Sequence, residues 1–191
     1  MEDALARWHA EHINFAALLD LLELQVAAFH AGDRPDYELM VDIIHYLRGY
    51  SDLVHHPRED VAFALMAQRD ASMSHVLSRL MQEHRVIAWS GEALLQKLDE
   101  SASDAMVTRA DVEAAAATYL VYYRHHLNTE ERDVLPRARE LLSEDDWRAV
   151  AAAGPSISDP LIADVVEARY AGLRDWVGQH GRGLADKTRP T

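Results

Sequence analysis

The chain has 191 residues, of which 49% are hydrophobic and 27% charged, and its formal net charge is −13. This balance is typical of a soluble protein with one sizeable domain, and the strong negative charge argues against nucleic acid and anionic membranes as partners. Because the chain has no cysteine, disulfides, thiolate-bound zinc and cysteine-held iron–sulfur clusters are excluded.

Hydrophobic residues recur at helical spacing in four long blocks, and no alternating strand pattern interrupts them. Gly32 and Pro35 mark the end of the first block, and Pro57 should kink or split the second. We expect helices over about Asp3–Phe29, Tyr37–Met66, Ser72–Leu98 and Thr108–Leu142. Four long helices with short connections predict an all-α, antiparallel up-down-up-down bundle.

The carboxyl-terminal part adds two shorter helical patterns. Ser143–Asp146 is typical of a helix start, Gly154 with Pro155 should end that helix, and a last helix is expected over about Asp159–Val177. We therefore divide the chain into residues 1–150, forming the bundle, and residues 151–191, a helical extension. The extension should pack on the bundle or form a homodimer contact.

The amino-terminal segment has no basic region followed by an apolar core, as a secretory signal would. No apolar run approaches the roughly 20 residues of a membrane span. We therefore expect a cytoplasmic protein without a membrane partner.

The chain has 11 histidines, and each long helix places one of them in its apolar stripe or at the edge of it. These are His12, His55, His84 and His126. Imidazoles that converge in a core are costly unless they share a partner, and neutral imidazole is a good ligand for iron, zinc and manganese. A metal is the most economical partner.

The other histidines fit this pattern less well. His56 is predicted to lie nearly opposite the apolar stripe of its helix, and His75 points away from its own stripe. His125 lies about 100° from His126 around the helix axis. His9 is intermediate, about 60° from His12 around the helix axis.

Carboxylates supply the second half of the pattern. Three histidine–carboxylate pairs are four residues apart, one turn along a helix: His55 with Glu59, His56 with Asp60, and His126 with Glu130. Two such pairs and one histidine from each remaining helix would give four nitrogens and two carboxylates. That donor set suits a dinuclear iron or manganese site, because each carboxylate can span two ions.

Taken together, these segments resemble the hemerythrin-like, or HHE cation-binding, family over about residues 3–142. The matching segments are Glu11–Phe15, His55–Asp60, Glu83–His84 and His126–Glu131, followed by Leu135 and Pro136. The resemblance implies a four-helix bundle with a carboxylate-bridged pair of iron ions, for which manganese or zinc could substitute. It places the ligands at His12, His55, Glu59, His84, His126 and Glu130. His56 with Asp60 remains the alternative to His55 with Glu59, which both the family pattern and the helical angle favour.

The chain departs from the oxygen-carrying hemerythrins at one position. Those proteins have a second histidine four residues from the first on the third helix, where this chain has Leu80 and Ala88. The site is then one histidine short, and water, another carboxylate, Tyr123 or His9 could complete it. This departure argues against reversible oxygen carriage.

The resemblance implies a non-haem di-iron protein that binds or senses dioxygen, nitric oxide or peroxide, or that handles iron. The alternative is a di-iron enzyme acting on peroxide or nitric oxide, or a stress-response repair factor for iron centres. An enzyme would turn over its substrate, whereas a binding protein would show only a spectral change. A helical bundle with incidental histidines would contain no metal.

Overall fold

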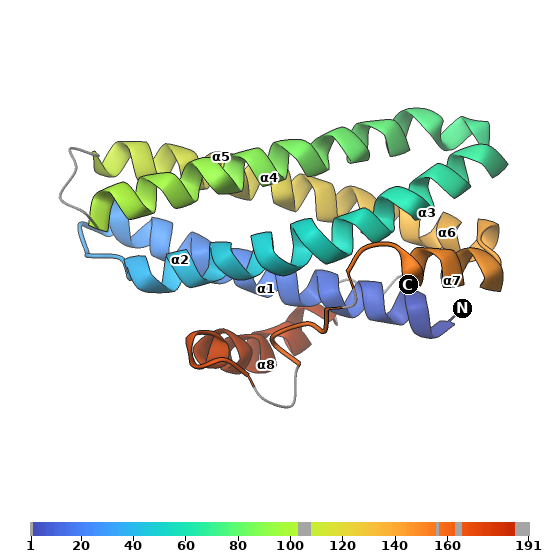
Figure 1. Ribbon diagram of the computed structural model, residues 1–191. Coiled ribbons are helices and arrows are strands. Elements are labelled where there is room, and N and C mark those ends of the chain that lie inside the picture. Colours follow the sequence, from blue (N-terminus) through green and yellow to red (C-terminus); the bar gives the residue numbers. More distant parts are fainter. Residues whose placement is uncertain (1, 103–107, 156, 163–165, 186–191) are drawn as a thin grey trace.

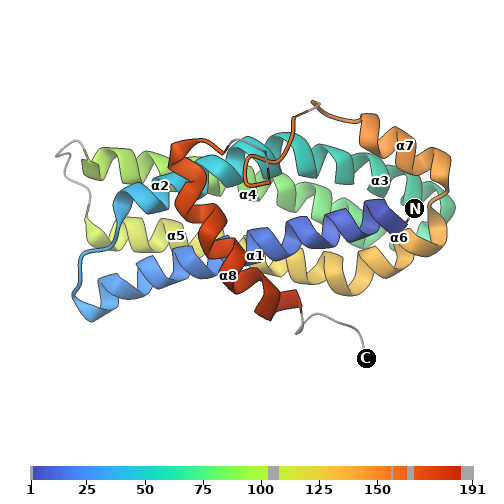
Figure 2. The same ribbon diagram turned by 90° about the horizontal axis from the view of Figure 1, so that it is seen from below.

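The computed structural model describes residues 2–102, 108–155, 157–162 and 166–185, and every regular element in these ranges is a helix. Four long helices lie side by side (Figures 1 and 2). The first is α1 (Glu2–Ala31), and the second joins α2 (Tyr37–Tyr46), η1 (Leu47–His55) and α3 (His56–Arg69). The third joins η2 (Ala71–Met73) and α4 (Ser74–Ala102), and the fourth joins α5 (Arg109–Thr129), η3 (Glu130–Val134) and α6 (Leu135–Leu141).

The predicted helix starts follow local capping chemistry. The side chains of Thr108 and Ser143 each accept a hydrogen bond from the backbone N–H three residues on, and the carboxylates of Asp111 and Asp146 accept one from the cap backbone N–H. These reciprocal bonds satisfy N–H groups that the first helical turn leaves unpaired. They fix the start of α5 and of the short helix α7 (Glu144–Ala152), where the sequence predicted them.

The predicted last helix starts later than expected. Asp159 does not begin a helix: its carboxylate accepts the backbone N–H of Leu161 at 2.8 Å and the hydroxyl of Tyr46 at 2.9 Å. This turn is typical of an aspartate before a proline, here Pro160. Regular structure resumes only at η4 (Ala168–Tyr170) and α8 (Ala171–Ala185), and residues 163–165 of the predicted helix lie outside the described ranges.

Helix α1 is long and apolar enough to cross a membrane by length and composition alone, over Ala4–Phe29. The expectation that no segment reaches that length is therefore wrong for this helix. Half of the apolar window is nevertheless buried inside the protein, as in the core helix of a soluble bundle. The composition of α1 reflects its central place in the fold.

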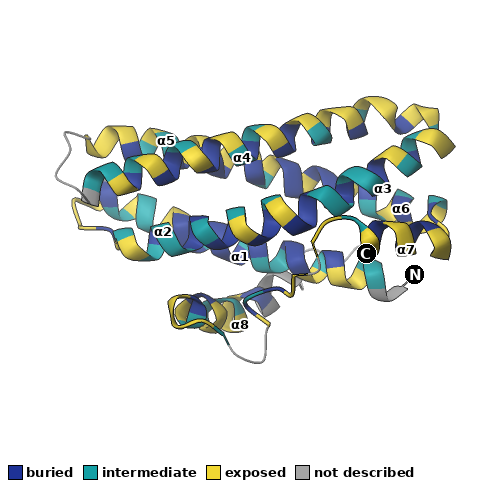
Figure 3. Ribbon diagram, viewed as in Figure 1, coloured by how far each residue is buried: buried dark blue, intermediate teal, exposed yellow. Residues whose placement is uncertain are grey.

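The inward faces of the long helices are largely buried (Figure 3). Their apolar residues form two hydrophobic clusters, one toward each end of the bundle. On α1, Phe15 belongs to one cluster and Trp8 to the other, and on α4 the same holds for Ile87 and Leu80. His12 lies between Trp8 and Phe15 along α1, and His84 lies between Leu80 and Ile87 along α4. A polar layer therefore lies between two apolar ones.

The extension packs on the bundle through α8, which crosses α1 (Figure 2). Leu173 is fully buried in the same cluster as Phe15, and the Trp176 indole N–H donates to the Ala17 carbonyl at 2.9 Å. The extension thus completes the hydrophobic core of the bundle.

Replacing Leu173 with alanine should lower the free energy of unfolding by about 2–4 kcal/mol, because a buried leucine leaves a cavity. Ile162→Ala in the same extension should change it by less than about 0.5 kcal/mol, since Ile162 is 73% exposed. Chemical denaturation of the two variants measures the difference. Equal stabilities would show that the extension is not part of the cooperative core.

Candidate metal centre

The four predicted histidines meet in the polar layer as two pairs. His12 Nε2 lies 3.0 Å from His55 Nε2, and His84 Nε2 lies 3.1 Å from His126 Nε2. All four side chains are buried. Two nitrogens bound at right angles to one ion, each about 2.1 Å from it, are about 3.0 Å apart. The spacing within each pair is that of two neighbouring ligands on one metal ion.

Glu59 faces both pairs. Its Oε1 lies 2.8 Å from His55 Nε2 and 3.2 Å from His12 Nε2, and its Oε2 lies 3.3 Å from His84 Nε2. The carboxylate therefore places one oxygen against each histidine pair. This is the arrangement that a carboxylate spanning two ions requires.

Glu130 makes the same kind of contact. Its Oε1 lies 3.0 Å from His126 Nε2 and 3.8 Å from His84 Nε2, and its Oε2 lies 3.6 Å from His12 Nε2. Glu59 and Glu130 thus repeat one pattern on the second and fourth long helices.

The oxygens of these two carboxylates need a further partner. Apart from the histidine contacts just described, Glu59 Oε2 and both oxygens of Glu130 are buried and make no hydrogen bond. Buried carboxylate oxygens are costly unless they are paired or bind a cation. Orphaned oxygens beside nitrogen pairs at ligand spacing fit a pair of divalent cations with mixed nitrogen and oxygen ligands.

The electrostatics favour ionised carboxylates at neutral pH. Burial works to raise the pKa of Glu59, but His55 and His12 beside it hold the pKa well below its usual range. Burial and the nearby charge of Glu59 work to raise the pKa of Glu130. His126 more than offsets them, so that this pKa lies below its usual value. Both groups therefore present negative charge to a cation.

The histidines show the complementary effect. Burial works to lower the pKa of each of the four, but the surrounding carboxylates more than offset burial and raise it. For His84, with Asp60 as the strongest of these partners, the pKa rises to about 11. A metal ion must therefore displace protons from this site, so its affinity should fall as the pH falls.

A second ring of carboxylates surrounds the histidines, and it joins the long helices in a closed cycle. Each histidine directs its Nδ1 to a carboxylate of another long helix: His55 to Glu11 at 2.6 Å, His84 to Asp60 at 2.8 Å, His126 to Glu83 at 3.4 Å, and His12 to Glu131 at 2.7 Å. An Nδ1–H that donates to a carboxylate leaves the Nε2 lone pair facing the centre. The outer carboxylates thus orient all four imidazoles for metal ligation.

The sequence contained a signal for this outer ring that single-helix periodicity does not reveal. Glu11 and Glu83 directly precede predicted ligand histidines, and Asp60 and Glu131 directly follow predicted ligand carboxylates. An adjacent residue points to the side of its own helix, and therefore toward the next helix. The outer carboxylates occupy these adjacent positions.

Two segments of π-helix carry the ligand-bearing turns of the second and fourth long helices. At the end of η1 the His56 N–H donates to the Ser51 carbonyl, and at the end of η3 the Leu135 N–H donates to the Glu130 carbonyl. Each acceptor lies five residues before its donor, as in a π-helix. Each segment lies directly before a proline in the first turn of the next helix, Pro57 or Pro136. Because proline disrupts the normal bonding of the preceding turn, the helix widens there instead of breaking.

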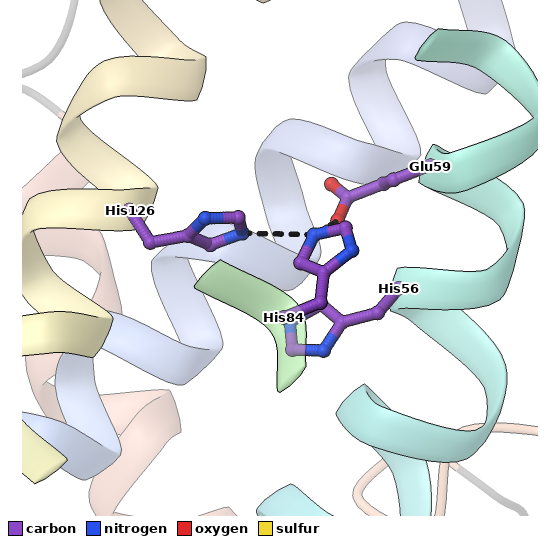
Figure 4. A group of neighbouring side chains, drawn as sticks. All are labelled: His56, Glu59, His84 and His126. Atoms are coloured by element: carbon purple, nitrogen blue, oxygen red, sulfur yellow. Dashed lines mark hydrogen bonds and ion pairs between the residues drawn. The ribbon is translucent and has the colours of Figure 1, made fainter. Parts of the chain in front are cut away.

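The placement of His56 corrects the sequence prediction. His56 does not lie opposite the apolar face: it is buried, and its ring stacks on His84 with centroids 4.2 Å apart. A π-turn rotates the chain less per residue than an α-turn, so His55 and His56 both face inward. The ligand atoms of His56, Glu59, His84 and His126 lie within 4.8 Å of one another (Figure 4). His12, His55 and Glu59 form a second such group.

The alternative pair of His56 with Asp60 does not form. Asp60 is turned outward to His84, with a side chain that is 42% exposed, and no ion pair joins it to His56 among the described residues. His56 instead shares a hydrogen bond of 3.1 Å with the Ser51 hydroxyl. Burial lowers the pKa of His56 well below its usual value, which keeps the imidazole neutral and able to bind a metal.

The remaining candidates lie outside the cluster of ligand atoms. His9 is partly exposed and bonds through Nδ1 to Glu131 at 2.9 Å, beyond His12. Tyr123 is buried and bonds to Ser51, and burial raises the pKa of its hydroxyl well above the usual value, so it remains a neutral phenol. His125 is 57% exposed.

Comparison with known protein families gives one match. A family model described as the hemerythrin HHE cation-binding domain matches residues 3–138. The match covers all four long helices up to the middle of α6, including every residue of the cluster. Comparison with the curated proteins and with the solved structures gives no match.

Replacing Glu11 with glutamine should weaken metal binding roughly 10- to 100-fold, the range observed when groups that orient a ligand histidine are removed. The amide keeps the size of the side chain but loses the charge that aligns His55. Competition with a chelator measures the affinity. Glu23→Gln, on the same helix but 65% exposed, is the control and should bind metal as the unaltered chain does. Equal affinities would mean that Glu11 does not orient His55.

Proposed function

Because the chain belongs to the hemerythrin HHE cation-binding family, we propose that it is a non-haem di-iron protein whose centre binds dioxygen, nitric oxide or peroxide. The observation that carries the proposal is the position of Glu59 and Glu130. Each faces both histidine pairs, and three of their four oxygens are buried without a hydrogen bond.

In this proposal His12 and His55 would hold one ion, and His84 and His126 would hold the other. Glu59 and Glu130, which face both histidine pairs, would serve both ions. His56 adjoins the second group and would give it a third nitrogen. The two ions therefore differ in their protein ligands, and the ion with fewer nitrogens has more room for an exogenous ligand.

Iron is the metal we propose, although the same donors would accept manganese or zinc. Iron bound here would supply a change of oxidation state and a position for a small ligand. The protein supplies orientation through the outer carboxylates and a dry environment through the two hydrophobic clusters. Phe15 and Phe63, one from each cluster, pack against His55 and His84.

We take the four long helices to be an antiparallel up-down-up-down bundle, and we place the protein in the cytoplasm. The buried state of α1 supports this location, because a helix that contributes Glu11 and His12 to the centre does not span a membrane at the same time.

Metal analysis with optical spectroscopy tests the proposal directly. The full chain purified from its own host should contain two iron ions per chain, and its absorption should change when dioxygen, nitric oxide or peroxide is added to the reduced protein. A steady consumption of peroxide or nitric oxide would favour an enzyme instead. A chain without stoichiometric metal, which also takes up none on reconstitution, would contradict the proposal.

Substituting one of two adjacent histidines tests the ligand assignment. His126→Ala should lose most of the bound metal and lower the melting temperature of the metal-loaded protein, because metal binding to the folded state contributes to folding free energy. His125→Ala should change both quantities little, since that side chain is 57% exposed. Identical metal content and melting temperature in the two variants would show that the assignment is wrong.

A further inference from the structure

A cavity of about 80 Å³ lies between α1, the first turn of α3 and α7. Its walls are formed by Ala4, Arg7, Trp8, Glu11, Arg58, Trp147, Val150 and Ala151. None of these residues belongs to the proposed metal ligands. A cavity of this volume holds several water molecules or one small solute.

Arg58 is the most unusual part of the wall. Its Nε is buried without a hydrogen-bond partner, and the guanidinium makes no ion pair with the described residues. A guanidinium is permanently charged and carries five N–H donors. The side chain is only partly buried, but a buried N–H without an acceptor is costly, so an acceptor that arrives from outside the chain would be favoured there.

A second donor in the wall is also unsatisfied. The side chain of Trp147 is 5% exposed, and its indole nitrogen is buried without a hydrogen-bond partner. The indole N–H can only donate. A ligand that satisfies this wall must therefore present acceptor atoms.

The carboxylate in the wall, Glu11, is already engaged. Both of its oxygens accept hydrogen bonds, from His55 at 2.6 Å and Tyr50 at 2.7 Å. The wall thus offers the charge of Arg58 and two unsatisfied N–H donors, in a chain whose net charge is −13.

We propose that this cavity is a binding site for a small planar oxyanion of three or four heavy atoms, the class that includes nitrate, nitrite, bicarbonate and formate. A planar oxyanion can accept two parallel hydrogen bonds from one guanidinium, which is the geometry that arginine recognises best. The indole N–H of Trp147 supplies a further donor. An anion of this size fits the volume of the cavity.

The site is separate from the proposed metal centre but close to it. Trp8 lines the cavity, and its ring centroid lies 6.0 Å from that of His55 and 5.3 Å from that of Trp147. An anion in the cavity is therefore one side chain away from a proposed ligand. The cavity wall itself contains no such ligand, so its occupancy can be tested whether or not the centre contains metal.

Titration with sodium nitrate, followed through the indole N–H signals in a ¹⁵N–¹H NMR spectrum, tests the site. Sodium chloride keeps the ionic strength constant. The full chain is measured both after loading with zinc, which is diamagnetic, and after treatment with a chelator. The signals of Trp8 and Trp147 should shift and saturate in both samples. Those of Trp89, which is 69% exposed, and Trp176, which bonds to Ala17, should not shift.

Two arginine variants make the assignment specific. Arg58→Gln should weaken nitrate binding at least about tenfold, as expected for the loss of hydrogen bonds to a charged partner. Arg148→Gln should change it less than about twofold, because Arg148 follows Trp147 directly but is 79% exposed and pairs with Asp145. Circular dichroism of both variants verifies that they remain folded.

Three results would overturn the proposal. The Trp8 and Trp147 signals would not respond to nitrate if water alone occupies the cavity. Binding of equal strength in Arg58→Gln would place the anion elsewhere. Binding that disappears with the chelator but survives Arg58→Gln would place it on the metal. None of these results bears on the iron content of the protein, so the site and the di-iron proposal fail independently.

Discussion

The burial of two ionised carboxylates between two histidine pairs is the constraint on which the rest of the structure depends. Glu59 and Glu130 are each about 1% exposed, and a buried negative charge without compensation is among the most destabilising features a core can contain. The histidines lower the pKa values of these carboxylates, and the outer carboxylates in turn raise those of the histidines. Compensation on this scale, with three oxygens still unsatisfied, is typical of a site built around a concentrated positive charge.

The fold supplies what this polar layer requires. Hydrophobic clusters on both sides keep water away, and the cycle of outer carboxylates ties each long helix to another. The second and fourth long helices contribute matching ligands: a histidine, a carboxylate four residues on that faces both histidine pairs, and an outer carboxylate next to it. Each also contains a π-segment and a proline, which lie before Glu59 in the second helix and from Glu130 onward in the fourth. The first and third contribute the simpler unit of an outer carboxylate followed by a histidine. The centre is therefore close to twofold symmetric, and His56 is the residue that breaks the symmetry.

Much of the fold and of the candidate site follows from periodicity. The long helices and the convergence of His12, His55, His84 and His126 could be predicted, because one inward position per turn is a property of a single α-helix. The inward position of His56 could not, since it depends on a local change from α- to π-bonding that the α-helical angle does not include. Of the outer carboxylates, helical spacing singles out only Asp60, as a partner of His56; it does not reveal Glu11, Glu83 and Glu131, because their partners belong to other helices. The turn at Asp159 was missed because its hydrogen bond to Tyr46 joins residues far apart in the sequence.

The most direct test of the account is a crystal structure of the iron-loaded protein with anomalous diffraction measured at the iron edge. The account predicts two anomalous peaks roughly 3–4 Å apart, the separation usual for dinuclear sites. One peak should lie beside His12 and His55, the other beside His84 and His126, with Glu59 and Glu130 in contact with both. A single peak, or iron bound outside this cluster, would contradict the account.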